Sequence, residues 1–184
     1  IHNSENSAPI SGTSHVGGFM GNAISGSYVR DSSNSGAVTG TSNVGGIMGS
    51  GSKAQIRSST NSGTITGKNN ATYIGGLAGS LYNSELKRSD TVNENKNTGS
   101  ISATLSNNST GAHSVGGLVG FASDTKIKSG ANTGRVEGGW RVGGIVGHQS
   151  GGSTSRENAY IYNEGSIYGY EQVGGIAGRA DGAG

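Results

Sequence analysis

The sequence contains no cysteine, one proline and few aromatic residues. Without cysteine the chain has neither a disulfide framework nor a thiolate metal site, so stability must come from packing and hydrogen bonds. Aromatic residues make up 5% of the chain and hydrophobic residues 30%, which is too little to fill the core of an ordinary two-layer domain. The composition therefore argues against a conventional globular fold unless a repeat supplies the order.

Long apolar runs and a strong charge imbalance are also missing. No run approaches the roughly 20 apolar residues that span a bilayer, and the first residues lack the basic and apolar segments of a secretion signal. Thirteen Lys and Arg oppose eleven Asp and Glu, a net charge of +2, which is too small for a nucleic-acid-binding surface. We expect no nucleic-acid partner and no direct membrane insertion, with any signal or anchor outside these residues.

Glycine, in contrast, is abundant and periodic. The chain has 37 Gly, and a V-G-G-x-x-G motif recurs along it. Its six copies begin at Val16, Val44, Ile74, Val115, Val142 and Val173. A fixed period of this kind indicates stacked repeats rather than low complexity. We divide the single repeat domain, 1–184, into repeats of approximately 1–28, 29–55, 56–91, 92–126, 127–157 and 158–184, and expect it to be a segment of a longer chain.

An asparagine precedes each glycine pair and forms a second landmark. Its copies are Asn6, Asn34, Asn61, Asn97, Asn132 and Asn163. Four residues beyond these lie Ile10, Val38, Ile65, Ile101, Val136 and Ile167. These residues, and those before each glycine pair, are all β-branched, a preference of pleated, half-buried strands.

The pattern predicts an all-β solenoid, or β-helix, of about six rungs with roughly three short strands each. One rung cannot bury its own apolar face, but stacking rungs about 4.8 Å apart pairs equivalent strands. The two β-branched columns would then form the structural core. The asparagine amides would hydrogen-bond one another or cap the turns.

A third, weaker apolar position lies five residues before the asparagine. It is occupied by Val29, Ile56, Val92 and Ile127, and by Asn158 in the last repeat. Insertions enlarge the third and fourth repeats around residues 83–96 and 104–113. We expect them to project as loops, where recognition on a rigid scaffold usually resides.

The glycine pair leaves one local question open. The apolar columns that begin at Val16 and Phe19 are three residues apart, so they would point to opposite faces of a regular strand. A bulge at Gly17 and Gly18 would turn both columns inward. Alternatively, both faces of this strand are covered.

The repeats resemble the GLUG motif family, whose units carry a G-G-[LI]-[VA]-G core and an N-x-G-x-[VI]-x-G strand. The counterparts here are G-G-L-V-G at 116–120 and N-T-G-R-V-E-G at 132–138. The resemblance covers essentially the whole chain, with departures at Ala8, Pro9 and Ala103. Such repeats occur in bacterial exported and cell-surface proteins, including adhesin-like proteins, so the resemblance implies an extracellular structural or adhesive module.

No catalytic, metal or cofactor site is predicted. The glycine motifs lack the following helix and Lys-Ser/Thr of a phosphate loop, and the carboxylates fall at different repeat offsets. The four histidines lie without metal-ligand spacing, so we expect them at the solvent-exposed surface. We therefore expect a non-enzymatic protein.

Two groups of residues are candidates for ligand binding. Arg30, Arg57 and Lys128 share the offset four before the asparagine, where they would form an outward basic column or are merely scattered solvated charges. Half of the aromatic residues fall in the last two repeats: Trp140, Tyr160, Tyr162, Tyr168 and Tyr170. These rings would stack on sugars or pack against a following domain. Of this second group, Trp140, Tyr168 and Tyr170 are the candidate binding residues.

The sequence thus favours a rigid spacer or ligand-presenting stalk with a host glycan or host protein as partner. One alternative is an accessory solenoid of a secreted protease or polysaccharide-degrading enzyme. Another is an ice-binding solenoid, although its column reads Ser11, Thr39, Thr66, Ser102, Glu137 and Tyr168. Because no cap is visible at either end, we also expect the solenoid ends to meet neighbouring copies or domains.

Overall fold

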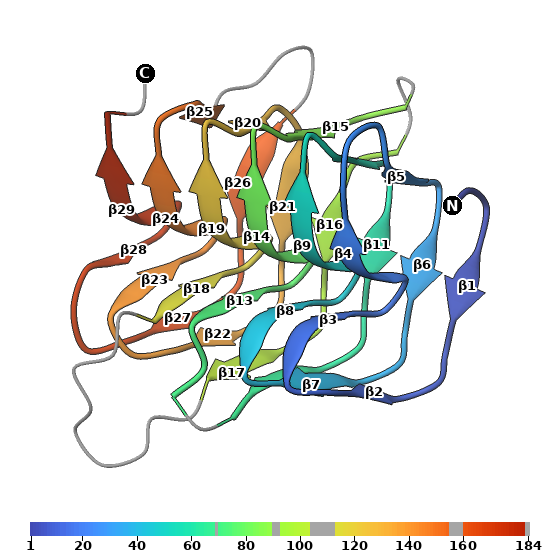
Figure 1. Cartoon of the computed structure of the whole chain (residues 1–184). Helices are drawn as coiled ribbons and strands as arrows, with labels where there is room; N and C mark the ends of the chain where they lie inside the picture. Colours follow the sequence, from blue (N-terminus) through green and yellow to red (C-terminus); the bar gives the residue numbers. More distant parts are fainter. Residues whose placement is uncertain (69, 90–92, 104–112, 155–159, 183–184) are drawn as a thin grey trace.

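A computed structural model describes residues 1–68, 70–89, 93–103, 113–154 and 160–182. These residues form an all-β parallel solenoid of about five turns without a helix, which confirms the predicted fold class. Figure 1 shows equivalent strands of successive turns side by side, with the colours changing from blue to red along the stack. The described part of the chain therefore contains no helix long and apolar enough to cross a membrane.

The strands assemble into five parallel sheets, which we name A to E. Sheet B contains β1 (Glu5–Asn6), β6 (Ser33–Asn34), β11 (Thr60–Asn61), β16 (Lys96–Asn97), β21 (Gly130–Asn132) and β26 (Ile161–Asn163). Sheet C contains β2 (Ile10–Ser11), β7 (Val38–Gly40), β12 (Ile65–Gly67), β17 (Ile101–Ala103), β22 (Val136–Glu137) and β27 (Ile167–Tyr168). Sheet D contains β3 (Ser14–Gly17), β8 (Ser42–Gly45), β13 (Tyr73–Gly75), β18 (Ser114–Gly116), β23 (Arg141–Gly143) and β28 (Val173–Gly174).

The chain continues from sheet D into sheets E and A before it enters the next turn. Sheet E contains β4 (Met20–Ala23), β9 (Met48–Ser52), β14 (Ala78–Tyr82), β19 (Val119–Ser123), β24 (Val146–Ser150) and β29 (Ala177–Asp181). Sheet A contains β5 (Tyr28–Arg30), β10 (Gln55–Arg57), β15 (Glu85–Lys87), β20 (Lys126–Ile127) and β25 (Ser153–Thr154). A full turn thus has five strands rather than three, because the asparagine segment is itself a strand and each V-G-G-x-x-G motif spans two.

Two apolar cores run along the solenoid. Sheets C and D enclose the first, which contains the column of Val38 and the column of Val44. Both columns are in register from end to end, and their inner members are fully buried. Members at the ends of the columns are less buried: Ile10 and Ile167 are half-buried, and Val173 is 46% exposed.

Sheets A and E enclose the second core, in which Ile56 aligns with Leu86 and Leu86 with Ile127. The prediction of Val92 for this column is therefore wrong, because the insertion follows the strand instead of preceding it. Val92 itself lies outside the described residues, as does Asn158. In the next turn the backbone partner of Ile127 is Thr154, not Asn158.

The glycine motif forms a corner between two sheets. The chain bends at Gly18 and Phe19 between β3 and β4, so the Val16 column enters the first core while the Phe19 column enters the second. Neither of the two expected arrangements, a bulge at Gly17 and Gly18 or a strand covered on both faces, is therefore present in the described motif. Glycine is required because backbones touch here: a Cβ on Gly76 would clash with the Gly117 carbonyl and the Asn97 side chain.

The asparagine column forms an unbroken hydrogen-bonded ladder between the two cores. From Asn6 to Asn132, each side-chain Nδ2 donates to the Oδ1 of the asparagine in the next turn, at 2.7 Å for Asn6 and 2.8 Å for the rest. Each Nδ2 also donates to the carbonyl two residues ahead in its own turn, as Asn97 does to Gly99 at 2.8 Å. The ladder thus joins neighbouring turns and caps each bend, and its inner members are buried.

Candidate functional site

The predicted basic column lies on the outer face of sheet A. Arg30 and Arg57 are in register, and the next member is Lys87, which the sequence analysis missed. Lys128 follows, with its backbone N–H bonded to the Leu86 carbonyl. Lys87 was hidden because the insertion behind it shifts its distance from Asn97, whereas the alignment of Glu85–Lys87 with Gln55–Arg57 would have revealed it.

Partners within the same face neutralise much of this basic column. The Glu85 carboxylate binds Lys87 Nζ at 2.7 Å and Lys128 Nζ at 2.8 Å. Burial alone would raise the pKa of Glu85, but hydrogen bonds from Lys128 and Lys87 outweigh it and hold the pKa below its ordinary value. Arg30 pairs with Asp31 at 3.1 Å, and the Arg57 guanidinium lies 5.5 Å from the centre of the Tyr28 ring. Sheet A therefore presents an alternating ionic face rather than a purely basic one.

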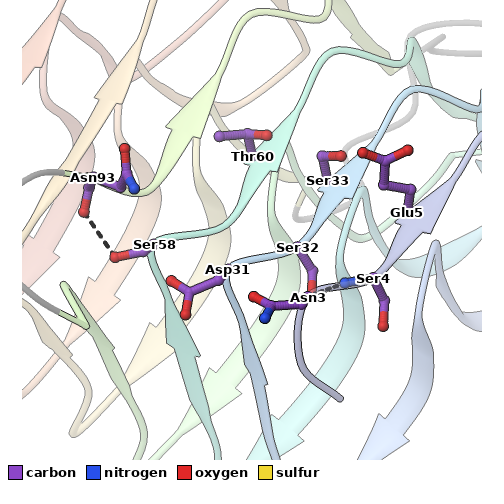
Figure 2. Close-up of a pocket in the computed structure, with 9 residues that line it drawn as sticks. All are labelled: Asn3, Ser4, Glu5, Asp31, Ser32, Ser33, Ser58, Thr60 and Asn93. Carbon is purple, nitrogen blue, oxygen red and sulfur yellow. Dashed lines mark hydrogen bonds between the residues drawn. The ribbon is translucent and has the colours of Figure 1, made fainter.

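Two shallow polar grooves border this ionic face. The larger, of about 390 Å³, lies where sheet A turns into sheet B and is lined by Asn3, Ser4, Glu5, Asp31, Ser32, Ser33, Ser58, Thr60 and Asn93. Figure 2 shows these side chains, including the Ser58 hydroxyl that donates to the Asn93 carbonyl at 2.7 Å. The Ser89 hydroxyl donates to Asp31 at 3.0 Å. The described part of the insertion is thus attached to the rod at this groove.

The smaller groove, of about 300 Å³, lies where sheet E turns into sheet A. Its lining includes Lys53, Gln55, Glu85, Asp124 and Lys126. The predicted loop at 83–96 is partly incorrect, because Glu85–Lys87 form β15 and Lys96 begins β16 within the solenoid. The loop predicted at 104–113 falls, apart from His113, outside the described residues.

The aromatic candidates lie around sheet C at the last turns. Tyr168 and Tyr170 are exposed, whereas Trp140 is half-buried. The Arg135 guanidinium lies over the Tyr168 ring at 4.5 Å from its centre. Tyr162 lies elsewhere, on sheet B, where its hydroxyl donates to Glu94 at 2.9 Å. The structure does not gather these aromatic residues into one site with the basic column.

A different aromatic cluster, absent from the sequence analysis, lies on the outer side of the corner between sheets D and E. Tyr73 stacks on Phe121 with ring centres 4.9 Å apart and planes inclined by 23°. Tyr82 lies 5.6 Å and His148 5.1 Å from the same ring. Phe121 replaces the serine at the equivalent position, Ser80, of the preceding turn. This change from serine to phenylalanine was the feature of the sequence that could have indicated the cluster.

The histidines depart from the expected exposed positions in two cases. His113 is buried and its Nδ1 contacts the Ala71 carbonyl, while His148 is half-buried and contacts Asp181 at 2.9 Å. Burial lowers the pKa of His148, although the Asp181 carboxylate opposes that effect. Within the described ranges, no three His, Asp or Glu side chains are placed to hold a metal ion.

The hydroxyl column considered for ice binding lies in register on sheet C. Thr39 aligns with Thr66 and Thr66 with Ser102, but Glu137 and then Tyr168 follow. A bulky acid and an aromatic ring thus interrupt the regular surface after four turns.

These surfaces present charged pairs, amides and hydroxyls that the stacked turns hold in register. Comparisons with protein families, with curated proteins and with solved structures found no match to this chain.

Proposed function

We propose that this chain is a non-enzymatic structural and adhesive module that acts as a rigid, ligand-presenting stalk. The observation that carries the proposal is the continuous register of all five sheets, which holds outward side chains at intervals of about 4.8 Å along one axis. A scaffold of this kind gives its surface residues fixed relative positions, so ligand binding loses little conformational entropy.

The ionic face of sheet A supports ligand presentation. Its charges come from consecutive turns and are oriented by one another, as Glu85 orients Lys87 and Lys128. The two polar grooves flank this face and offer amide and hydroxyl groups on either side. The proposed partner is a host glycan or a host protein with complementary charge.

The resemblance to GLUG repeats supports an extracellular location, secreted or at a bacterial cell surface. We also propose that a neighbouring copy or domain covers the last turn, where Val173 and Ile176 are 46% and 41% exposed. Light scattering over a range of protein concentrations tests self-association, since growth in mass would support contact between copies.

A glycan and host-protein binding screen tests the function. The intact chain is compared with a variant in which residues 88–94 and 104–112 are replaced by short Gly-Ser linkers, which leaves β15 and β16 in place. Loss of binding would assign recognition to the insertions, and unchanged binding would assign it to the faces of the rod. Absence of any binding would leave the spacer role alone, and cleavage of a screened glycan or protein would contradict the non-enzymatic proposal.

A further inference from the structure

The aromatic cluster at the D–E corner adjoins a row of charged residues along the same edge. Strands of sheet D lie against the sheet E strands of the following turn, which brings the two outer faces together at this corner. We name the following residues the corner strip: Tyr73, Tyr82, Phe121, Arg141, His148 and Arg179. They come from four consecutive turns, so the strip extends about 14 Å along the axis.

Two polar groups in or beside this strip lack partners in the described part of the chain. The half-buried Arg141 guanidinium has no hydrogen bond or ion pair there. Ser114, which is in register with both Tyr73 and Arg141, is fully buried, yet its hydroxyl has no hydrogen-bond partner among the described residues. Buried polar groups in native proteins are nearly always satisfied, so this hydroxyl differs from the paired buried side chains of the asparagine ladder.

The remaining charges leave the strip positive. Arg179 Nε is held by Asp181 at 3.0 and 2.8 Å, and His148 contacts the same carboxylate. Burial lowers the pKa of His148 and thereby favours its neutral form. Among the described residues Arg141 therefore provides the uncompensated positive charge, and it lies one turn beyond Phe121 along the stack.

We propose that the corner strip binds an acidic saccharide chain. The half-buried rings of this cluster offer their outer apolar surfaces to the C–H faces of pyranose rings. The Arg141 guanidinium, which has no partner among the described residues, offers paired donors to a carboxylate. The length of the strip fits several linked sugars better than a single anion. This inference refines the ligand-presenting role and rests on it for its biological meaning, but the binding itself is independent of sheet A.

Calorimetric titration with oligomers of a hexuronic acid tests the proposal. The same oligomers with their carboxyl groups reduced to alcohols provide the neutral control. Phe121→Ser, which copies the residue of the preceding turn, and Arg141→Gln are each expected to weaken uronate binding at least tenfold. Lys96→Gln on sheet B removes one positive charge outside both the corner strip and the ionic face of sheet A. It is the matched control and should leave the affinity unchanged, with thermal unfolding used to verify that every variant is folded.

The outcomes separate this site from the wider function. Binding of the uronate oligomer that is weaker for the reduced oligomer and is lost in both corner variants supports the proposal. Equal affinity for both oligomers, affinity retained in both corner variants, or affinity lost only in Lys96→Gln overturns it. Absence of uronate binding also overturns it, but a different ligand found in the screen would still support the ligand-presenting stalk.

Discussion

A single asparagine side chain performs two structural tasks in each turn, because its amide has two donor hydrogens and an acceptor oxygen. Asn97 is fully buried, donates to Gly99 and Asn132, and accepts from Asn61. Its removal would leave three buried polar groups without their partners. The cost of such a change exceeds that of a lost surface hydrogen bond, since each unsatisfied buried group is penalised by desolvation.

Asn97→Ala is therefore expected to lower the free energy of unfolding by about 2 to 4 kcal/mol. Denaturant titration followed by circular dichroism measures the change. Asn6→Ala is the matched control, because Asn6 is only half-buried at the first position of the ladder, and its loss should cost about 1 kcal/mol or less. Equal costs at the two positions would show that the ladder does not act through buried hydrogen bonds.

At the scale of the element, the D–E corner depends on the absence of a side chain. A Cβ on Gly76 would overlap the Gly117 carbonyl and the Asn97 amide, so Gly76→Ala should destabilise by about 3 kcal/mol or more. Gly175 occupies the same motif position in the last turn, where a Cβ would meet nothing within 4 Å. Thermal unfolding should place Gly175→Ala close to the unsubstituted chain, and a comparable loss in both variants would contradict the steric explanation.

The ion pairs of Glu85 on sheet A should make the stability of the fold depend on pH. Because the pKa of Glu85 is lowered below its ordinary value of 4.5, its ionised form stabilises the fold. That contribution is fully present above the ordinary value and is lost as the pH falls through the folded-state pKa. Glu85→Gln should thus reduce the loss of stability between pH 7 and about pH 3. Urea unfolding across this range measures it, with Glu5→Gln on the exposed edge of sheet B as control. Identical pH profiles for all three proteins would contradict the assignment.

The elements also show why some features could be predicted and others could not. The β-branched and asparagine columns were recognisable because one β-branched residue lies four positions after the asparagine in every copy, and another directly precedes every glycine pair. Leu86 and Lys87 were missed because a variable insertion separates them from Asn97, so a fixed offset selected the wrong residue. The ring cluster was missed because Tyr73 and Phe121 come from different sheets of different turns, and only the corner geometry brings them together.

Because equivalent residues of successive turns are in register, one whole turn can be removed while the remaining turns stay aligned. Val29 aligns with Ile56, so deletion of residues 29–55 joins Tyr28 directly to Ile56 and removes one turn without shifting any column. We expect a folded rod shortened by about 4.8 Å, with unchanged strand content. Small-angle scattering and circular dichroism measure these properties. Deletion of residues 29–41 is the control, since it would join sheet A to sheet D and should prevent folding.

The asparagine ladder also gives the rod a direction. Every amide donates toward the C-terminal end, so that end presents the second N–H of Asn163 while the other presents the Oδ1 of Asn6. Whatever continues the ladder beyond Asn163 must bring an acceptor, and whatever continues it before Asn6 must bring a donor. Two like ends placed together would oppose donor to donor or acceptor to acceptor. The ladder therefore favours extension in which a donor end meets an acceptor end, and disfavours contact between two like ends.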